Sequence, residues 1–79
     1  MGERFPAITY REVAGVLKQL GFKFYRQGKG SHEIWRRLSD GRHTTVPHHK
    51  GKIIKRRTLK TIINDTGLSV EEFKKLLRG

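Results

Sequence analysis

Residues 22–46 read FKFYRQGKGSHEIWRRLSDGRHTTV, and this segment carries the signals for β-structure on which the predicted fold rests. Its aromatic and β-branched residues are typical of β-strands, and two turn signals divide it. The first signal is the glycine-rich run at 28–30, and the second is Ser-Asp-Gly at 39–41, a strong hairpin signal. Pro47 lacks the N–H that a strand ladder needs and ends the last segment. The stretch predicts an antiparallel meander of three strands, at 22–27, 31–38 and 42–46.

Helical patterns flank this meander on both sides. Thr9 and Glu12 form a capping box ahead of apolar residues at helical spacing, and a glycine ends that segment. Two more helices follow the basic loop at 48–54, and a second capping box, Ser69 with Glu72, opens the last of them. The predicted helices cover 10–20, about 56–65, and a short segment after residue 69.

This order of elements predicts an α+β fold, a small two-layer α-β-β-β-α domain with an extra short C-terminal helix. The 79 residues form a single domain, in which residues 1–8 are expected to be a flexible N-terminal tail. Helices on one face of the sheet leave the opposite face and the basic loop exposed to a partner. Three aromatic side chains are expected in the core: Phe22, Phe24 and Phe73. Tyr25 and Trp35 fit either core packing or base stacking on an exposed sheet.

Charge is the strongest compositional signal. Lys and Arg total 18 against 7 Asp and Glu, which gives a formal net charge of +11. Such a charge attracts polyanions, so nucleic acid ranks ahead of an anionic membrane or an acidic protein. No apolar run approaches the roughly 20 residues of a membrane span, and no signal-peptide pattern opens the chain. We therefore expect a cytoplasmic location and no membrane partner.

Most catalytic chemistry lacks its residues here. The chain has no cysteine, and no hydroxyl residue stands at a spacing that pairs it with a base, beyond the adjacent Ser31 and His32. The glycine-rich turn lacks the frame of a Walker loop. Paired carboxylates are missing from the strand region. A zinc site is conceivable, but nothing completes an obvious ligand set around the histidines, so no metal and no cofactor are expected.

His32 is the best-placed catalytic candidate. It begins a strand directly after a glycine-rich turn, where backbone N–H groups can approach a phosphate. RNA carries its own nucleophile, the 2′-hydroxyl, so cleavage needs only a base, an acid and positive charge on the phosphate. A histidine that titrates near neutrality can exchange the proton, while Lys and Arg stabilise the phosphoryl oxygens. The pattern is also compatible with an exposed histidine or a simple phosphate contact.

Several motifs resemble those of the HicA (YcfA-like) toxins. Gly30-Ser31-His32 looks like that family's G-S-H signature, and Thr45-Val46-Pro47-His48-His49 is similar to its V-P-x-H stretch. The segments 58–63, 67–69 and 71–73 resemble its second helix, its following turn and its terminal helix. Together these matches cover nearly the whole chain in the right order.

The resemblance implies a double-stranded-RNA-binding-domain-like fold and an mRNA-degrading endoribonuclease toxin whose partner is a HicB-type antitoxin. It implies that His32 is the catalytic residue, with Gly30, Ser31 and His49 in support, and we expect cleavage without a metal. The expected RNA-binding residues are Arg26, Lys29, Arg36, Lys50, Lys52, Lys55, Arg56 and Arg57. For the loop at 50–57, scattered solvation remains an alternative to phosphate binding. Two other functions stay open: a non-catalytic double-stranded-RNA-binding module, and a basic module that binds an acidic protein.

Overall fold

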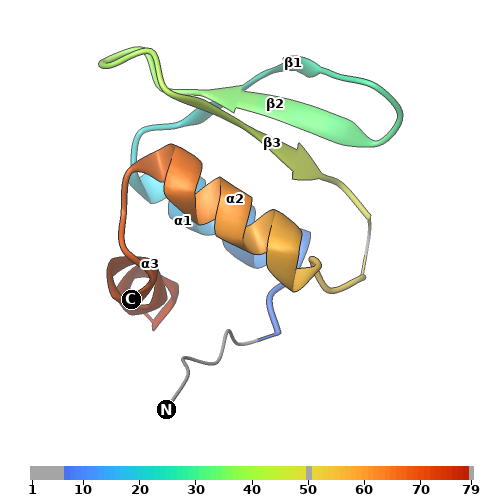
Figure 1. The fold of residues 1–79 in the computed structure, drawn as a ribbon. Helices are drawn as coiled ribbons and strands as arrows, with labels where there is room; N and C mark the ends of the chain where they lie inside the picture. The colour runs from blue at the N-terminus through green and yellow to red at the C-terminus, as the bar shows by residue number, and fades with distance from the viewer. Residues whose placement is uncertain (1–6, 50, 79) are drawn as a thin grey trace.

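The computed structural model describes residues 7–49 and 51–78. Within them the elements are α1 (Tyr10–Gln19), β1 (Lys23–Gln27), β2 (His32–Arg36), β3 (His43–Pro47), α2 (Arg56–Thr66) and α3 (Val70–Arg78). The strands form one antiparallel sheet in the order β1-β2-β3, and α1 and α2 lie under one face of it (Figure 1). The predicted α+β fold is confirmed. No helix in this described part is long and apolar enough to cross a bilayer.

The alternation of residues along β2 and β3 separates a covered face of the sheet from an open face. Glu33 and Trp35 of β2 are buried, as are Thr44 and Val46 of β3. These side chains point toward the helices, because successive residues of a strand point to opposite faces. The open face carries the remaining residues of the two strands, which the register pairs across the sheet: His32 with Pro47, Ile34 with Thr45, and Arg36 with His43.

The burial of the aromatic side chains differs from the prediction at one position. Phe22 and Phe73 are buried as expected, and Trp35, which was open to either interpretation, is a core residue at 3% exposure. The prediction for Phe24 is wrong, because its side chain is 51% exposed. Phe24 pairs with Trp35 and so points toward the helix side, but β1 is an edge strand whose register is irregular after Phe24 and whose five residues are all exposed.

Ile8 corrects the predicted boundary of the N-terminal tail. Its side chain is 2% exposed and belongs to the core. Its carbonyl accepts a hydrogen bond from the N–H of Ile54 at 2.8 Å, and Thr9 forms a β-bridge with Ile53. Burial of two isoleucines outweighs the absence of regular structure around them. The bridge fixes the basic loop against the start of α1; residues 1–6 of the predicted tail lie outside the described residues.

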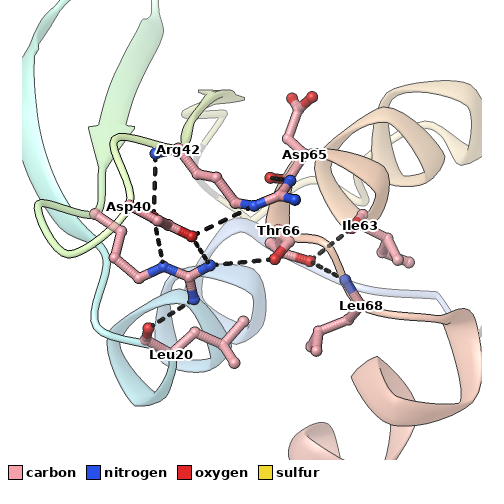
Figure 2. A network of polar contacts seen from close by, with 8 residues as sticks. Leu20, Asp40, Arg42, Ile63, Asp65, Thr66 and Leu68 are labelled. Carbon is pink, nitrogen blue, oxygen red and sulfur yellow. Dashed lines mark hydrogen bonds and ion pairs between the residues drawn. The ribbon is translucent and has the colours of Figure 1, made fainter.

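Two arginines of the β2–β3 hairpin are engaged in the fold itself (Figure 2). Arg37 donates to the carboxylate of Asp40 at 2.8 Å and to the carbonyl of Leu20 at 3.0 Å. Arg42 donates to the carbonyl of Asp65 at 3.2 Å. These contacts join the hairpin to the ends of α1 and α2. The hydrogen bond from Arg37 also holds the pKa of Asp40 down at about 2.

Candidate active site

A cleft of about 600 Å³ opens at the β3 edge of the sheet. The open sheet face, the loop after β3 and the first turns of α2 surround it. Its lining includes two histidines, His32 from β2 and His49 from the loop. Three cations also line it: Lys52, Lys55 and Arg57. The fold therefore brings residues from three separate parts of the chain to one basic hollow.

The turn before β2 fixes the backbone of His32. The His32 N–H donates to the carbonyl of Lys29 at 3.1 Å, and the His32 carbonyl accepts from the N–H of Gly28 at 2.7 Å. Gly30, at φ +58°, supplies the left-handed conformation that the turn needs. The N–H groups of Gly28 and His32 are thus occupied within the turn and are not offered to a phosphate. The exposed imidazole of His32, in contrast, makes no hydrogen bond with another described residue.

Ser31 and His49 meet beside His32. The Ser31 hydroxyl oxygen lies 3.4 Å from Nε2 of His49. The Ser31 carbonyl accepts a hydrogen bond from the N–H of His48 at 2.8 Å, which aligns the end of β3 with the start of β2. The two segments that carry the G-S-H and P-x-H motifs are therefore neighbours in space.

The start of α2 adds positive potential to the cleft. The other two helices begin with the predicted capping boxes, Thr9 with Glu12 in α1 and Ser69 with Glu72 in α3. The N-cap of α2, Lys55, makes no capping hydrogen bond with its side chain, and the first turn of this helix has no acidic residue. Uncapped N–H groups and the helix dipole favour an anion at this end. Arg56 and Arg57 in the first turn interact unfavourably with the helix dipole. They therefore make this end of α2 less stable but add positive charge to it.

Six of the eight predicted RNA-binding residues fall into two groups. The cleft group consists of Lys52, Lys55 and Arg57. The hairpin group lies on β1, β2 and the turn between them and consists of Arg26, Lys29 and Arg36. Arg56 is exposed on α2 but is not part of the cleft lining, and Lys50 lies outside the described residues.

A buried carboxylate lies on the covered sheet face, directly after His32 in the chain. Glu33 is 8% exposed. Its Oε1 accepts from the Tyr10 hydroxyl at 2.6 Å and from the Trp35 indole N–H at 3.1 Å, and its Oε2 lies 3.0 Å from Nδ1 of His48. The His48 ring stacks on the Tyr10 ring at a centroid distance of 3.8 Å. We call these four residues the Glu33 cluster.

The protonation states within the Glu33 cluster follow from its contacts. Burial on its own would raise the pKa of Glu33, but the hydrogen bonds from Tyr10, Trp35 and His48 outweigh it and lower the pKa below the ordinary value of 4.5. Burial and the hydrogen bond to Glu33 raise the pKa of Tyr10 to about 12. At neutral pH the carboxylate is ionised and the phenol is protonated. The cluster joins α1 to β2 and to the end of β3. It therefore holds the backbone next to both cleft histidines, since Glu33 follows His32 and His48 precedes His49.

Sequence reasoning missed the Glu33 cluster. The available signal was an acidic residue two positions before Trp35, on the same face of the strand, since a carboxylate on a buried face needs partners. The identity of those partners was not accessible, because Tyr10 and His48 lie 23 and 15 residues away along the chain. Across residues 7–49 and 51–78, no group of three or more His, Cys, Asp or Glu side chains is arranged to hold a metal ion.

The fold and the cleft define a class, that of a small basic α+β domain with a two-histidine cleft suited to phosphate anions. The sequence model of the HicA toxins of bacterial toxin–antitoxin systems matches residues 10–68, from α1 to the turn after α2. The chain therefore belongs to the HicA toxin family, and the partner of such a toxin is an antitoxin. A search of curated proteins gives no significant match.

Proposed function

We propose that this toxin is an endoribonuclease that cleaves mRNA in the cleft, with His32 as its catalytic residue and without a metal ion. The observation that carries the proposal is the position of His32. Its backbone is fixed by the preceding turn, and its exposed ring lines a cleft that also contains Lys52, Lys55 and Arg57. A proton-exchanging group and positive charge are what RNA cleavage requires of a protein.

The proposed reaction uses the nucleophile of the substrate. The 2′-hydroxyl oxygen attacks the adjacent phosphorus, the bond from phosphorus to the 5′-oxygen of the next nucleotide breaks, and a 2′,3′-cyclic phosphate forms. One group removes the 2′-hydroxyl proton and another donates a proton to the leaving 5′-oxygen. His32 performs one of these transfers, and each contributes about 10²- to 10⁴-fold in rate. His49, which lines the same cleft and contacts Ser31, is the candidate for the other.

The cations of the cleft have two roles in this proposal. Lys52, Lys55 and Arg57 stabilise the negative charge that develops on the phosphoryl oxygens. They also give the antitoxin its target: we assign that partner as a HicB-type antitoxin that covers the active face. Acidic side chains of the antitoxin would occupy the positions of the RNA phosphates, which the net charge of +11 on the toxin supports.

Incubation of the protein with a structured mRNA in the presence of EDTA tests the proposed function. The expected result is a set of fragments that end in cyclic phosphate, while the same RNA with 2′-O-methyl groups stays intact because it lacks the nucleophile. A strict requirement for Mg²⁺ would overturn the metal-free mechanism. Retention of duplex RNA on a gel without any fragments would instead favour the non-catalytic double-stranded-RNA-binding module, which the open basic sheet face also accommodates.

A further inference from the structure

A second exposed site lies on the open sheet face, away from the cleft. The guanidinium carbon of Arg36 lies 3.8 Å from the centroid of the Tyr25 ring. The Tyr25 side chain is 49% exposed, and Arg36 is half-buried. Both residues line a separate hollow of about 430 Å³, and neither belongs to the lining of the cleft. The stacked pair presents a flat, partly apolar and positively charged surface to solvent.

Strand β2 connects this pair to His32. His32, Ile34 and Arg36 alternate along β2 and share the open face. His32 and Arg36 are four positions apart in the chain, which corresponds to about 13 Å along a strand. At most about four nucleotides span this distance, because a nucleotide advances about 3.4 Å along a stacked strand and further along an extended one. A strand of RNA with one phosphate in the cleft therefore has a base within reach of Tyr25.

The cations near Tyr25 are available to a ligand. Lys23, Arg26 and Arg36 make no ion pair with any acidic residue in the described part of the chain, whereas the neighbouring Arg37 and Arg42 both pair with Asp40. Lys23 pairs with Arg36 across the sheet, and Arg26 pairs with Ile34 midway toward His32. Because like charges on one face are not neutralised internally, this surface favours a polyanion.

We propose that Tyr25 and Arg36 form a stacking platform for an unpaired base of the RNA substrate. Aromatic rings and guanidinium planes bind the faces of bases, and only a base outside a duplex exposes its face. The platform therefore selects RNA that is single-stranded a few nucleotides from the bond that His32 cleaves. This inference rests on the proposed function for the position of that bond, but it concerns binding and not the chemical step.

The test measures the affinity of the protein for a 2′-O-methyl single-stranded RNA of about eight nucleotides, which resists cleavage. Fluorescence anisotropy compares the unchanged protein with Tyr25→Ala, Tyr25→Phe and Phe24→Ala. Tyr25→Ala is expected to weaken binding by about 5- to 100-fold, the loss of one stacked base, and Tyr25→Phe to retain affinity. Phe24→Ala removes a comparably exposed ring, at 51%, that also borders the hollow but shares the face of Trp35; stacking on Tyr25 predicts a smaller loss of affinity for Phe24→Ala than for Tyr25→Ala.

Two further measurements separate stacking from charge and from misfolding. In an RNA scan, each nucleotide in turn is made abasic and the affinity is measured. Removal of the base at one position should weaken binding to the unchanged protein. Removal of the same base should not change the affinity for Tyr25→Ala. This scan uses intact protein and does not depend on the folding of a variant. Tyr25→Ala should also leave the salt dependence of binding unchanged, whereas Arg36→Gln should reduce the slope of log affinity against log salt by about 1.

The platform is overturned if Tyr25→Ala binds the single-stranded RNA as tightly as the unchanged protein, or if no abasic position matters. Weaker binding of Tyr25→Ala to the antitoxin, with RNA binding unaffected, would overturn it in favour of a protein-docking surface. The two proposals fail separately. Cleavage of RNA without any role for Tyr25 removes the platform alone, and Tyr25-dependent binding without any cleavage removes the nuclease alone.

Discussion

Replacing Glu33 with glutamine removes the charge from a carboxylate that Tyr10, Trp35 and His48 all contact. The glutamine carbonyl keeps an acceptor for Tyr10 and Trp35, which both donate to Oε1. Its amide group then faces Nδ1 of His48 in place of an anionic oxygen. The change therefore preserves the shape and the neutral hydrogen bonds, and it tests the contribution of the charge to the Glu33 cluster.

The expected loss of stability is set by the difference between charged and neutral hydrogen bonds. Bonds to a charged group contribute about 1.5–3 kcal/mol each, and neutral bonds contribute about 1 kcal/mol. Part of the extra stabilisation from the charged hydrogen bonds is offset by the cost of burying the ionised carboxylate in the native protein. We expect Glu33→Gln to lower the free energy of unfolding by about 2 kcal/mol at neutral pH. For a domain of this size, such a loss lowers Tm by about 10 °C.

The pH dependence gives this prediction a signature. Because the pKa of Glu33 in the folded protein is lower than its ordinary value of 4.5, the unfolded chain takes up the proton first as the pH falls. The stabilisation by the carboxylate is complete above about pH 4.5, and it is lost as the pH falls through the folded-state pKa. The Tm difference between the unchanged protein and Glu33→Gln should therefore be largest at neutral pH and should narrow in acid.

Thermal unfolding followed by circular dichroism at several pH values measures this difference. Glu71→Gln is the matched control, because Glu71 is exposed on α3 and its substitution adds the same net charge without removing a buried contact. Equal unfolding temperatures for Glu33→Gln and Glu71→Gln at neutral pH would show that the charge of Glu33 does not stabilise the fold. A Tm difference that stays constant into acid would likewise show that the ionised form of Glu33 has no part in stability.

Three other substitutions test a turn glycine, a helix cap and a cation of the cleft. Gly67→Ala should lower the free energy of unfolding by about 1–2 kcal/mol in urea, because φ is +85° and a Cβ would lie 3.1 Å from the guanidinium carbon of Arg42; an unchanged unfolding midpoint would contradict this. Thr9→Ala should cost about 1 kcal/mol through loss of the α1 capping box, and equal thermal stability would show that the cap is dispensable. Lys55→Gln should weaken RNA binding and reduce its salt slope by about 1, and an unchanged slope would remove Lys55 from the phosphate contacts.

The fold was largely predictable because its signals are local. Capping boxes, turn glycines and the spacing of apolar residues gave the order of elements and the boundaries of α1 and α2 to within one residue. The errors concern tertiary position. Phe24 has the pattern of a core residue, but the strand that carries it lies at the sheet edge. Ile8 stands in a segment without periodicity, and its burial depends on Ile54, far along the chain.

The candidate site was predictable only where its residues are close in sequence or carry a recognisable motif. His32 follows its glycine turn directly, and His49 belongs to a motif, so both could be named. Both histidines line one cleft because β2 pairs with β3, and this pairing places Ser31 in contact with His49. The Glu33 cluster was hidden because three separate elements supply it. The sequence did not separate the hairpin group from the cleft group, because the packing of the loop after β3 and of α2 beside the sheet decides which cations line the cleft.

The proposed role of His32 in RNA cleavage is tested by a comparison of His32→Ala with His43→Ala. Both histidines are exposed on the open sheet face, but His43 is not part of the cleft lining. RNA fragments would be measured over time in EDTA with purified proteins of equal thermal stability. We expect His43→Ala to cleave like the unchanged protein and His32→Ala to lose at least about 100-fold in rate. Equal cleavage by His32→Ala and the unchanged protein would contradict the proposed role of His32.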